Sequence, residues 1–259
     1  MTELKTIQQP KQFNVLLIGD SCIDEYCYGL VERLSPESPV PVLKFLKTTS
    51  NPGMAANVKQ NLIAFGLDVD FITNSERITK TRYIEIKSGH HMLRVDNDIE
   101  LLPWSGHLPF SLNEYDAIVI SDYNKGFLTY ETIEKICNDF VGPIFIDTKK
   151  TDLVRFTNCY VKINELEYKA STSKCQNLIV TKGSLGAMYK NTLYPTAAQE
   201  VVDVCGAGDT FLAALVYQYL NTNSIKEAIR FANKCSAITV RHRGVYALSI
   251  EDIQKVKSK

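Results

Sequence analysis

The chain has 259 residues, of which 45% are hydrophobic and 22% are charged, as in an ordinary globular protein. Its 29 lysine and arginine residues balance 29 aspartate and glutamate residues, so no net field draws it onto nucleic acid or an anionic membrane. A chain of this length can bury a deep apolar core without disulfides or a structural metal. We therefore expect one main domain spanning residues 1–259 and no binding to nucleic acid.

The cysteines and the apolar runs indicate the compartment. Seven cysteines form an odd set without a C-x-x-C pair, which predicts free thiols in a reducing cytosol. The longest apolar stretches, such as Phe211–Leu220, are well below the roughly 20 residues that a membrane span needs. The N-terminal residues are polar and lack the apolar region of a signal peptide. We expect a cytoplasmic protein without membrane contact.

Short apolar runs alternate with helix-like stretches along the chain. The runs predict buried strands at residues 14–18, 70–72, 117–120, 144–146, 160–163 and 178–180. Helix-like stretches lie at 55–65, 129–139 and 164–170. This alternation predicts an α/β fold, with a largely parallel sheet and helices on both of its faces.

Other segments differ from this pattern. Residues near 26–48 and 79–96 are strand-like but are not followed by long helices, so we assign them to a small β flap outside the main sheet. The C-terminal third is helical, with an apolar stripe that begins at Phe211. A second helix begins at Ser224, where Glu227 completes a capping box.

The most informative segment is residues 201–210, with the sequence VVDVCGAGDT. Gly206 and Gly208 flank Ala207, so consecutive backbone N–H groups can converge, and the helix that follows adds its positive end. Such a site can hold a phosphate group. Asp209 could take a proton from an attacking hydroxyl group. On this pattern alone, a glycine-rich turn with Asp209 as a plain helix cap is the more common outcome.

The run D-x-x-G-A-G-D-T-F resembles the C-terminal signature of the ribokinase-like (PfkB) carbohydrate kinases. This resemblance implies a three-layer α/β/α fold whose β flap acts as a lid. It also implies that Asp209 is the catalytic base and that the amides of Gly206, Ala207 and Gly208 form an anion hole.

The N-terminal half resembles the same family in two places. Residues 19–24 are similar to the opening strand, which implies that Asp24 binds sugar hydroxyls. Residues 51–58 are similar to the first signature, which implies that Gly53 lets the backbone approach the sugar and that Asn57 bonds to it. Met54 replaces the second glycine of that signature, so the size and shape of the sugar pocket stay open.

One branch of the family is similar over most of the chain. Its members phosphorylate a heptose 7-phosphate at O-1, often as the N-terminal half of a bifunctional ADP-heptose enzyme, and the matching segments are 33–42, 79–82, 93–96 and 121–126. This similarity implies a phosphosugar substrate, and an anionic substrate requires cations. The candidate substrate-binding residues are Lys80, Arg82, Arg94, Asp122, Lys125 and Lys149. Each cation taken alone is more often a solvated surface residue.

The nucleotide side also rests on resemblance. Asn164 and Glu167 match the N-x-x-E motif that orders Mg²⁺ and its waters at the triphosphate, and oxygen ligands suit Mg²⁺. The resemblance further assigns the nucleotide phosphates to Thr181, Lys182 and Gly183 and the adenine site to Asn233. It thus implies ATP and Mg²⁺. Thr210 and Gly244 lie in regions that bind a monovalent cation in some relatives.

Two departures leave alternatives open. A helix pair that relatives carry between Phe71 and Thr79 is missing, and no nucleotidyltransferase half follows the last helix, so we expect another protein to supply any such step. The first hypothesis is an ATP-dependent heptose 7-phosphate kinase that forms a homodimer through its flap. The alternatives are a kinase for another sugar and a catalytically reduced sugar- or nucleotide-binding protein.

Overall fold

A computed structural model of the chain describes residues 12–107, 111–197 and 200–258. Eight of the described strands form the central sheet, in the order β12-β11-β10-β9-β8-β7-β1-β4. Neighbours from β4 to β10 pair in parallel, and β11 and β12 continue the sheet in antiparallel pairing. The strands are β1 (Asn14–Gly19), β4 (Asp68–Ile72), β7 (Ala117–Asp122), β8 (Ile144–Thr148), β9 (Tyr160–Asn164), β10 (Leu178–Thr181), β11 (Ala187–Tyr189) and β12 (Thr192–Tyr194).

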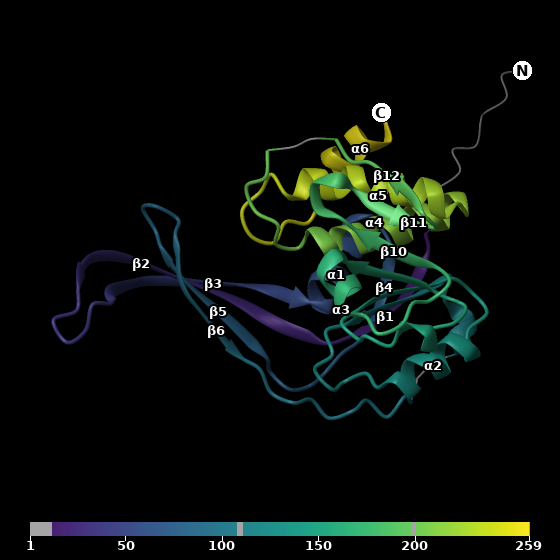
Figure 1. The fold of residues 1–259 in the computed structure, drawn as a ribbon, viewed down its shortest axis with the longest axis horizontal. Helices are drawn as coiled ribbons and strands as arrows, with labels where there is room; N and C mark the ends of the chain where they lie inside the picture. Colours follow the sequence, from purple (N-terminus) through teal and green to yellow (C-terminus); the bar gives the residue numbers. More distant parts are fainter. Residues whose placement is uncertain (1–11, 108–110, 198–199, 259) are drawn as a thin grey trace, which may run out of the picture.

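Helices cover both faces of this sheet (Figure 1). Alternate residues of a strand point to opposite faces, and β1 shows the result: Val15 and Leu17 pack with α1, α4 and α5, whereas Leu16 and Ile18 pack with α2. Because both faces are covered, the central strands are apolar throughout rather than alternating. The predicted three-layer α/β/α fold is confirmed. The helices are α1 (Ala55–Ala64), α2 (Tyr130–Asp139), α3 (Glu165–Ala170), α4 (Ala207–Thr222), α5 (Ile225–Thr239) and α6 (Ile250–Lys257), with short 3-10 turns at Leu112–Glu114, Leu153–Arg155 and Gly183–Leu185.

A second sheet extends away from this body, to the left in Figure 1. It is formed by β2 (Ser21–Leu34), β3 (Pro41–Met54), β5 (Thr79–Glu85) and β6 (His91–Asn97), in the order β3-β2-β5-β6. β2 begins and β3 ends closer to the core than the sequence indicated, because Ser21 pairs with Met54 directly beside the end of β1. The flap is therefore anchored at the carboxyl edge of the central sheet.

Met54 joins the flap to α1 in an unusual backbone conformation. It precedes the first residue of α1 with φ 57° and ψ −131°, a region that glycine adopts freely and residues with a Cβ atom do not. Its side chain is buried, at 4% exposure, in the apolar cluster on the α2 face. The chain thus keeps the backbone turn expected of a glycine while packing a large side chain there.

The start of α5, the cysteines and the lengths of the helices complete the description of the fold. Ser224 caps α5 by accepting a hydrogen bond from the Glu227 amide, but the reciprocal bond from the Glu227 side chain that a capping box needs is not among the contacts of the described residues. All seven cysteines lie in the described parts of the chain and are free thiols. Within the described residues, no helix is both long enough and apolar enough to cross a membrane.

Candidate active site

A pocket of about 140 Å³ lies where β7, β8 and β9 end and α4 begins. The carboxyl edge of a parallel sheet is where such folds bind ligands. The strand ends contribute Asp122, Tyr123, Asp147, Lys149 and Lys162, and the helix starts contribute Asn164, Glu167, Gly206, Gly208 and Asp209. Seven of these ten lining residues are candidates from the sequence; Tyr123, Asp147 and Lys162 are not.

Asp209 is buried at the start of α4 and is held by two donors. The Asn57 Nδ2 atom donates to its Oδ2 atom at 2.6 Å, and the Tyr123 hydroxyl donates to its Oδ1 atom at 3.2 Å. Burial raises the pKa of Asp209 to about 6, although the bond from Asn57 opposes the rise. At neutral pH the carboxylate is therefore mostly ionised yet basic enough to accept a proton.

A chain of polar contacts fixes this carboxylate between three helices. Asn61 Nδ2 donates to the Asn57 carbonyl at 2.9 Å, and Thr210 Oγ1 donates to Asn61 Oδ1 at 2.9 Å. Thr239 on α5 in turn donates to Thr210 at 3.2 Å. Asn57 was expected to bind sugar. Here its side-chain amide donates a hydrogen bond to Asp209, so it positions the candidate base.

The glycines beside Asp209 lie close to polar side chains. Gly206 has φ 74°, and a Cβ atom there would lie 3.1 Å from Asn57 Nδ2. A Cβ atom on Gly208 would lie 3.0 Å from Lys162 Nζ. The Ala207 amide already donates to the Val204 carbonyl at 3.3 Å, whereas the amides of Gly206 and Gly208 donate to no acceptor among the described residues. Two of the three expected amides are thus free to meet an anion.

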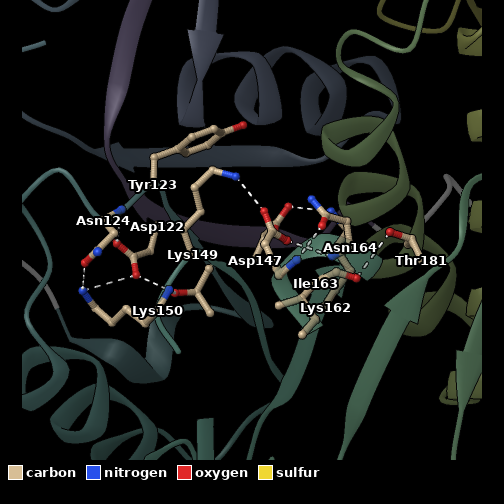
Figure 2. Close-up of polar contacts among 12 residues, drawn as sticks. Asp122, Tyr123, Asn124, Asp147, Lys149, Lys150, Lys162, Ile163, Asn164 and Thr181 are labelled. Atoms are coloured by element: carbon tan, nitrogen blue, oxygen red, sulfur yellow. Dashed lines mark hydrogen bonds and ion pairs between the residues drawn. The ribbon is translucent and has the colours of Figure 1, made fainter. Parts of the chain in front are cut away.

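Lys162 and Asp147 form a buried ion pair in the pocket wall. The two residues are register neighbours on β9 and β8, and Lys162 Nζ lies 2.7 Å from Asp147 Oδ2 (Figure 2). Burial alone would lower the pKa of Lys162, but the charge and hydrogen bond of Asp147 outweigh it and raise that pKa. The ammonium group therefore stays charged. The signal in the sequence was a lysine inside the apolar run Y-V-K-I-N.

The N-x-x-E segment forms the start of α3. Asn164 Oδ1 accepts from the Glu167 amide at 2.9 Å and Glu167 Oε2 accepts from the Asn164 amide at 2.8 Å, which is a reciprocal capping box. Glu167 Oε1 lies 2.6 Å from Lys149 Nζ. Each of these oxygens already contacts a protein group, so the oxygens fit Mg²⁺ through bound water rather than by direct coordination. The expected substrate ligand Lys149 thus lies beside the candidate metal residue.

A second polar cluster lies at the base of the flap. Asp24 is buried and pairs with Arg82, whose Nη1 atom is 2.5 Å from Asp24 Oδ1. A Cβ atom on Gly53 would come within 2.4 Å of Asp24 Oδ2, so only glycine fits there. The Arg82 guanidinium group lies over the Tyr26 ring, and the buried Tyr26 hydroxyl group has no hydrogen-bond partner among the described residues. Tyr26 was not a candidate from the sequence.

The remaining candidates have local partners. Asp122, in the pocket wall, accepts from Thr148 Oγ1 at 2.6 Å and lies near the buried Lys150 (Figure 2). Outside the pocket lining, Arg94 pairs with Asp96 at 2.6 Å and Lys125 pairs with Asp98.

The nucleotide candidates also contact protein. Thr181 Oγ1 donates to the Ile163 carbonyl at 3.3 Å, and Lys182 lies 4.0 Å from Glu165. Gly183 begins a 3-10 turn, and Asn233 Nδ2 donates to the Tyr194 carbonyl at 2.8 Å. The last contact ties α5 to β12.

The chain is similar in sequence to a known family model and to a curated protein. Residues 152–253 match the family model described as pfkB family carbohydrate kinase. The bifunctional protein HldE of Klebsiella pneumoniae strain 342 is 28% identical over 306 aligned positions, which cover 96% of this chain and 64% of that protein. The chain therefore spans less than two thirds of this relative's length.

Solved structures share the fold. The ribokinase of Thermotoga maritima superposes with a TM-score of 0.73 at 17% identity, covering 95% of this chain and all of the other. The Arabidopsis thaliana ribokinase complexed with ribose and ATP superposes with a TM-score of 0.68 at 12% identity, covering 95% of this chain and 99% of the other. At these identities the likeness shows a ribokinase-like fold.

Proposed function

We propose that the chain is a carbohydrate kinase of the pfkB family, because residues 152–253 match that family's model and the fold is ribokinase-like. In this proposal it transfers the γ-phosphoryl group of ATP to a hydroxyl group of a sugar. The observation that carries this proposal is the buried Asp209 carboxylate, with a pKa of about 6, beside the free amides of Gly206 and Gly208. A base and an anion-binding pair of amides are what phosphoryl transfer to an alcohol requires.

Each residue of the site has its own role in the proposed transfer. The sugar oxygen forms a bond to the γ-phosphorus atom, the bond from that phosphorus to the bridging oxygen of ADP breaks, and the hydroxyl proton passes to Asp209. The amides of Gly206 and Gly208 bind the negative charge of the transferring group. Asn57 and Tyr123 hold the carboxylate in place. Asn164 and Glu167 would hold Mg²⁺ through water, and the bound ion would supply positive charge beside the phosphates.

The sugar we propose is a heptose 7-phosphate that accepts the phosphoryl group at O-1. Residues 33–42 and 121–126 carry the resemblance that implies it. The charges around the base favour an anionic substrate: Lys80 and Lys149 place their ammonium groups 5.5 Å and 5.1 Å from the centre of the Tyr123 ring. Asp24 is poised at the base of the flap to accept sugar hydroxyls.

We also propose that two copies pair through the flap. Its strands carry exposed apolar side chains, among them Phe45 at 62% and Leu93 at 58% exposure. Pairing would cover these side chains and close the flap over the sugar, which keeps water away from the phosphoryl group. Sedimentation of the wild type and of Phe45→Glu tests this: we expect a dimer and a monomer, and a monomeric wild type would contradict it.

The test of function is ADP release measured with a panel of phosphorylated and unphosphorylated sugars. We expect turnover with a phosphosugar and its loss in Asp209→Asn; equal turnover by that variant would remove the proposed base. Met54 and the missing helix pair favour the second candidate, a binding protein without transfer activity. Sugar binding by calorimetry without ADP release would support this second function.

A further inference from the structure

Lys162 places its ammonium group beside the turn that contains Gly206 and Gly208. It comes from β9 and is only 4% exposed, yet it lines the pocket together with Gly208 and Asp209. A Cβ atom on Gly208 would lie 3.0 Å from Lys162 Nζ, so the ammonium group packs against the backbone of this residue. The glycine at position 208 therefore leaves space for a cation directly beside a free amide.

The surroundings of this ammonium group are anionic. It lies 2.7 Å from Asp147 Oδ2, and the charges of Asp209 and Glu167 also act on it. A lysine ammonium group has three hydrogens, so the bond to Asp147 leaves donors for another acceptor. A buried ion pair is weak evidence for a stabilising role. The position of this pair in the wall of a polar pocket points instead to a ligand.

We propose that Lys162 is a catalytic residue that binds the transferring phosphoryl group, completing an anion hole otherwise made by the amides of Gly206 and Gly208. The inference rests on the proposed function. In the transition state, negative charge is spread over the three equatorial oxygens of the phosphoryl group. Lys162 donates a hydrogen bond to one of them and keeps its own protons, because the proton of the sugar hydroxyl goes to Asp209. Asp147 is the positioning residue that holds the ammonium group in place.

Two variants separate this role from a structural one. Lys162→Met removes the cation but leaves the Asp147 carboxylate buried without its partner, so folding also suffers. The double variant Asp147→Asn/Lys162→Met removes both charges and leaves no unpaired ion. If Lys162 serves only to neutralise Asp147, the double variant recovers both stability and turnover. If Lys162 binds the phosphoryl group, stability recovers and turnover does not.

We expect kcat of the double variant to fall roughly 10²–10³-fold, as when one donor of an oxyanion hole is removed, with KM for the sugar unchanged. Wild-type turnover in the double variant would overturn the proposal. A second readout needs no sugar: calorimetry of ADP with and without aluminium fluoride, which mimics the γ-phosphoryl group. We expect aluminium fluoride to tighten ADP binding in the wild type and not in the double variant.

The two readouts distinguish the failure of this inference from the failure of the proposed function. If the wild type phosphorylates no sugar of the panel, the proposed function fails, and calorimetry still decides the role of Lys162. Equal tightening by aluminium fluoride in the wild type and the double variant, or none in either, would overturn the role assigned to Lys162.

Discussion

At position 54 we predict that glycine gives a more stable protein than alanine, which is the reverse of their usual order. Its φ of 57° and ψ of −131° belong to a region that costs a residue with a Cβ atom roughly 1–3 kcal/mol. Met54→Ala keeps this strain and loses the buried side chain, so the free energy of unfolding should fall by about 2–5 kcal/mol. Met54→Gly loses the same packing but releases the strain.

The difference between the two variants isolates the backbone term. Glycine ordinarily costs about 0.5–1 kcal/mol relative to alanine because it has more freedom in the unfolded chain. Subtracting this from the released strain, and noting that glycine is the better residue before a first helical turn, leaves Met54→Gly more stable than Met54→Ala by roughly 1 kcal/mol. Both variants empty the same part of the α2-side core, so the packing loss cancels in the comparison.

Urea unfolding followed by circular dichroism measures this difference as a shift in midpoint at constant slope. The matched control is Gln60, an exposed residue inside α1, where Gln60→Gly should be less stable than Gln60→Ala by about 1 kcal/mol. If Met54→Ala equals or exceeds Met54→Gly in stability while the control behaves as expected, the backbone at Met54 is not strained and the reasoning fails.

Three further predictions concern the ionised groups. The proposed base must be deprotonated, so kcat/KM should rise with pH through about 6, the pKa of Asp209. Asn57→Ala should move this rise to higher pH, because it removes a hydrogen bond that lowers the pKa of Asp209. A pH profile that is flat around 6, or that is the same in Asn57→Ala, speaks against Asp209 as the base. The raised pKa of Asp209 means that the folded state binds a proton more tightly than the unfolded state, so stability falls as pH rises from about 4 to about 6. At pH 7, Asp209→Asn should therefore raise the free energy of unfolding by on the order of 3 kcal/mol, and urea midpoints that do not rise would contradict this. Arg82→Met leaves the Asp24 carboxylate buried without its partner and should cost about 3–5 kcal/mol in the same assay, whereas Asp24→Asn/Arg82→Met should recover most of the loss.

The central sheet could be predicted because its physical signal is local. Residues 117–120 are apolar throughout, as expected of a parallel strand covered on both faces. The inner ends of the flap strands gave a weaker signal, since the buried positions at the start of β2 are Cys22, Asp24 and Tyr26, and a carboxylate interrupts the apolar pattern. The strands β11 and β12 are three residues each, too short for a periodic pattern to show.

The site could be predicted only as far as its residues follow one another in the chain. Gly206, Gly208 and Asp209 form one turn, and their spacing already contains their geometry. Lys162 and Asp147 are 15 residues apart and meet only because β9 and β8 are register neighbours. Arg94 and Lys125 do not line this pocket and pair with Asp96 and Asp98, partners that sequence spacing alone does not identify; their contact with a substrate stays a prediction.

The ion pairs of the pocket explain how it could bind a polyanion without a net positive charge. Each pocket lysine pairs with a carboxylate, Lys149 with Glu167 and Lys162 with Asp147, and the buried Lys162 is fixed in place before any ligand arrives. Fixed charges lose little energy to reorganisation when negative charge develops beside them. Lys149 is the more exposed of the two cations, at 46% of its side chain against 5% for Lys162. We therefore expect Lys149 to adjust as substrates enter, while Lys162 keeps its position against Gly208 throughout the transfer.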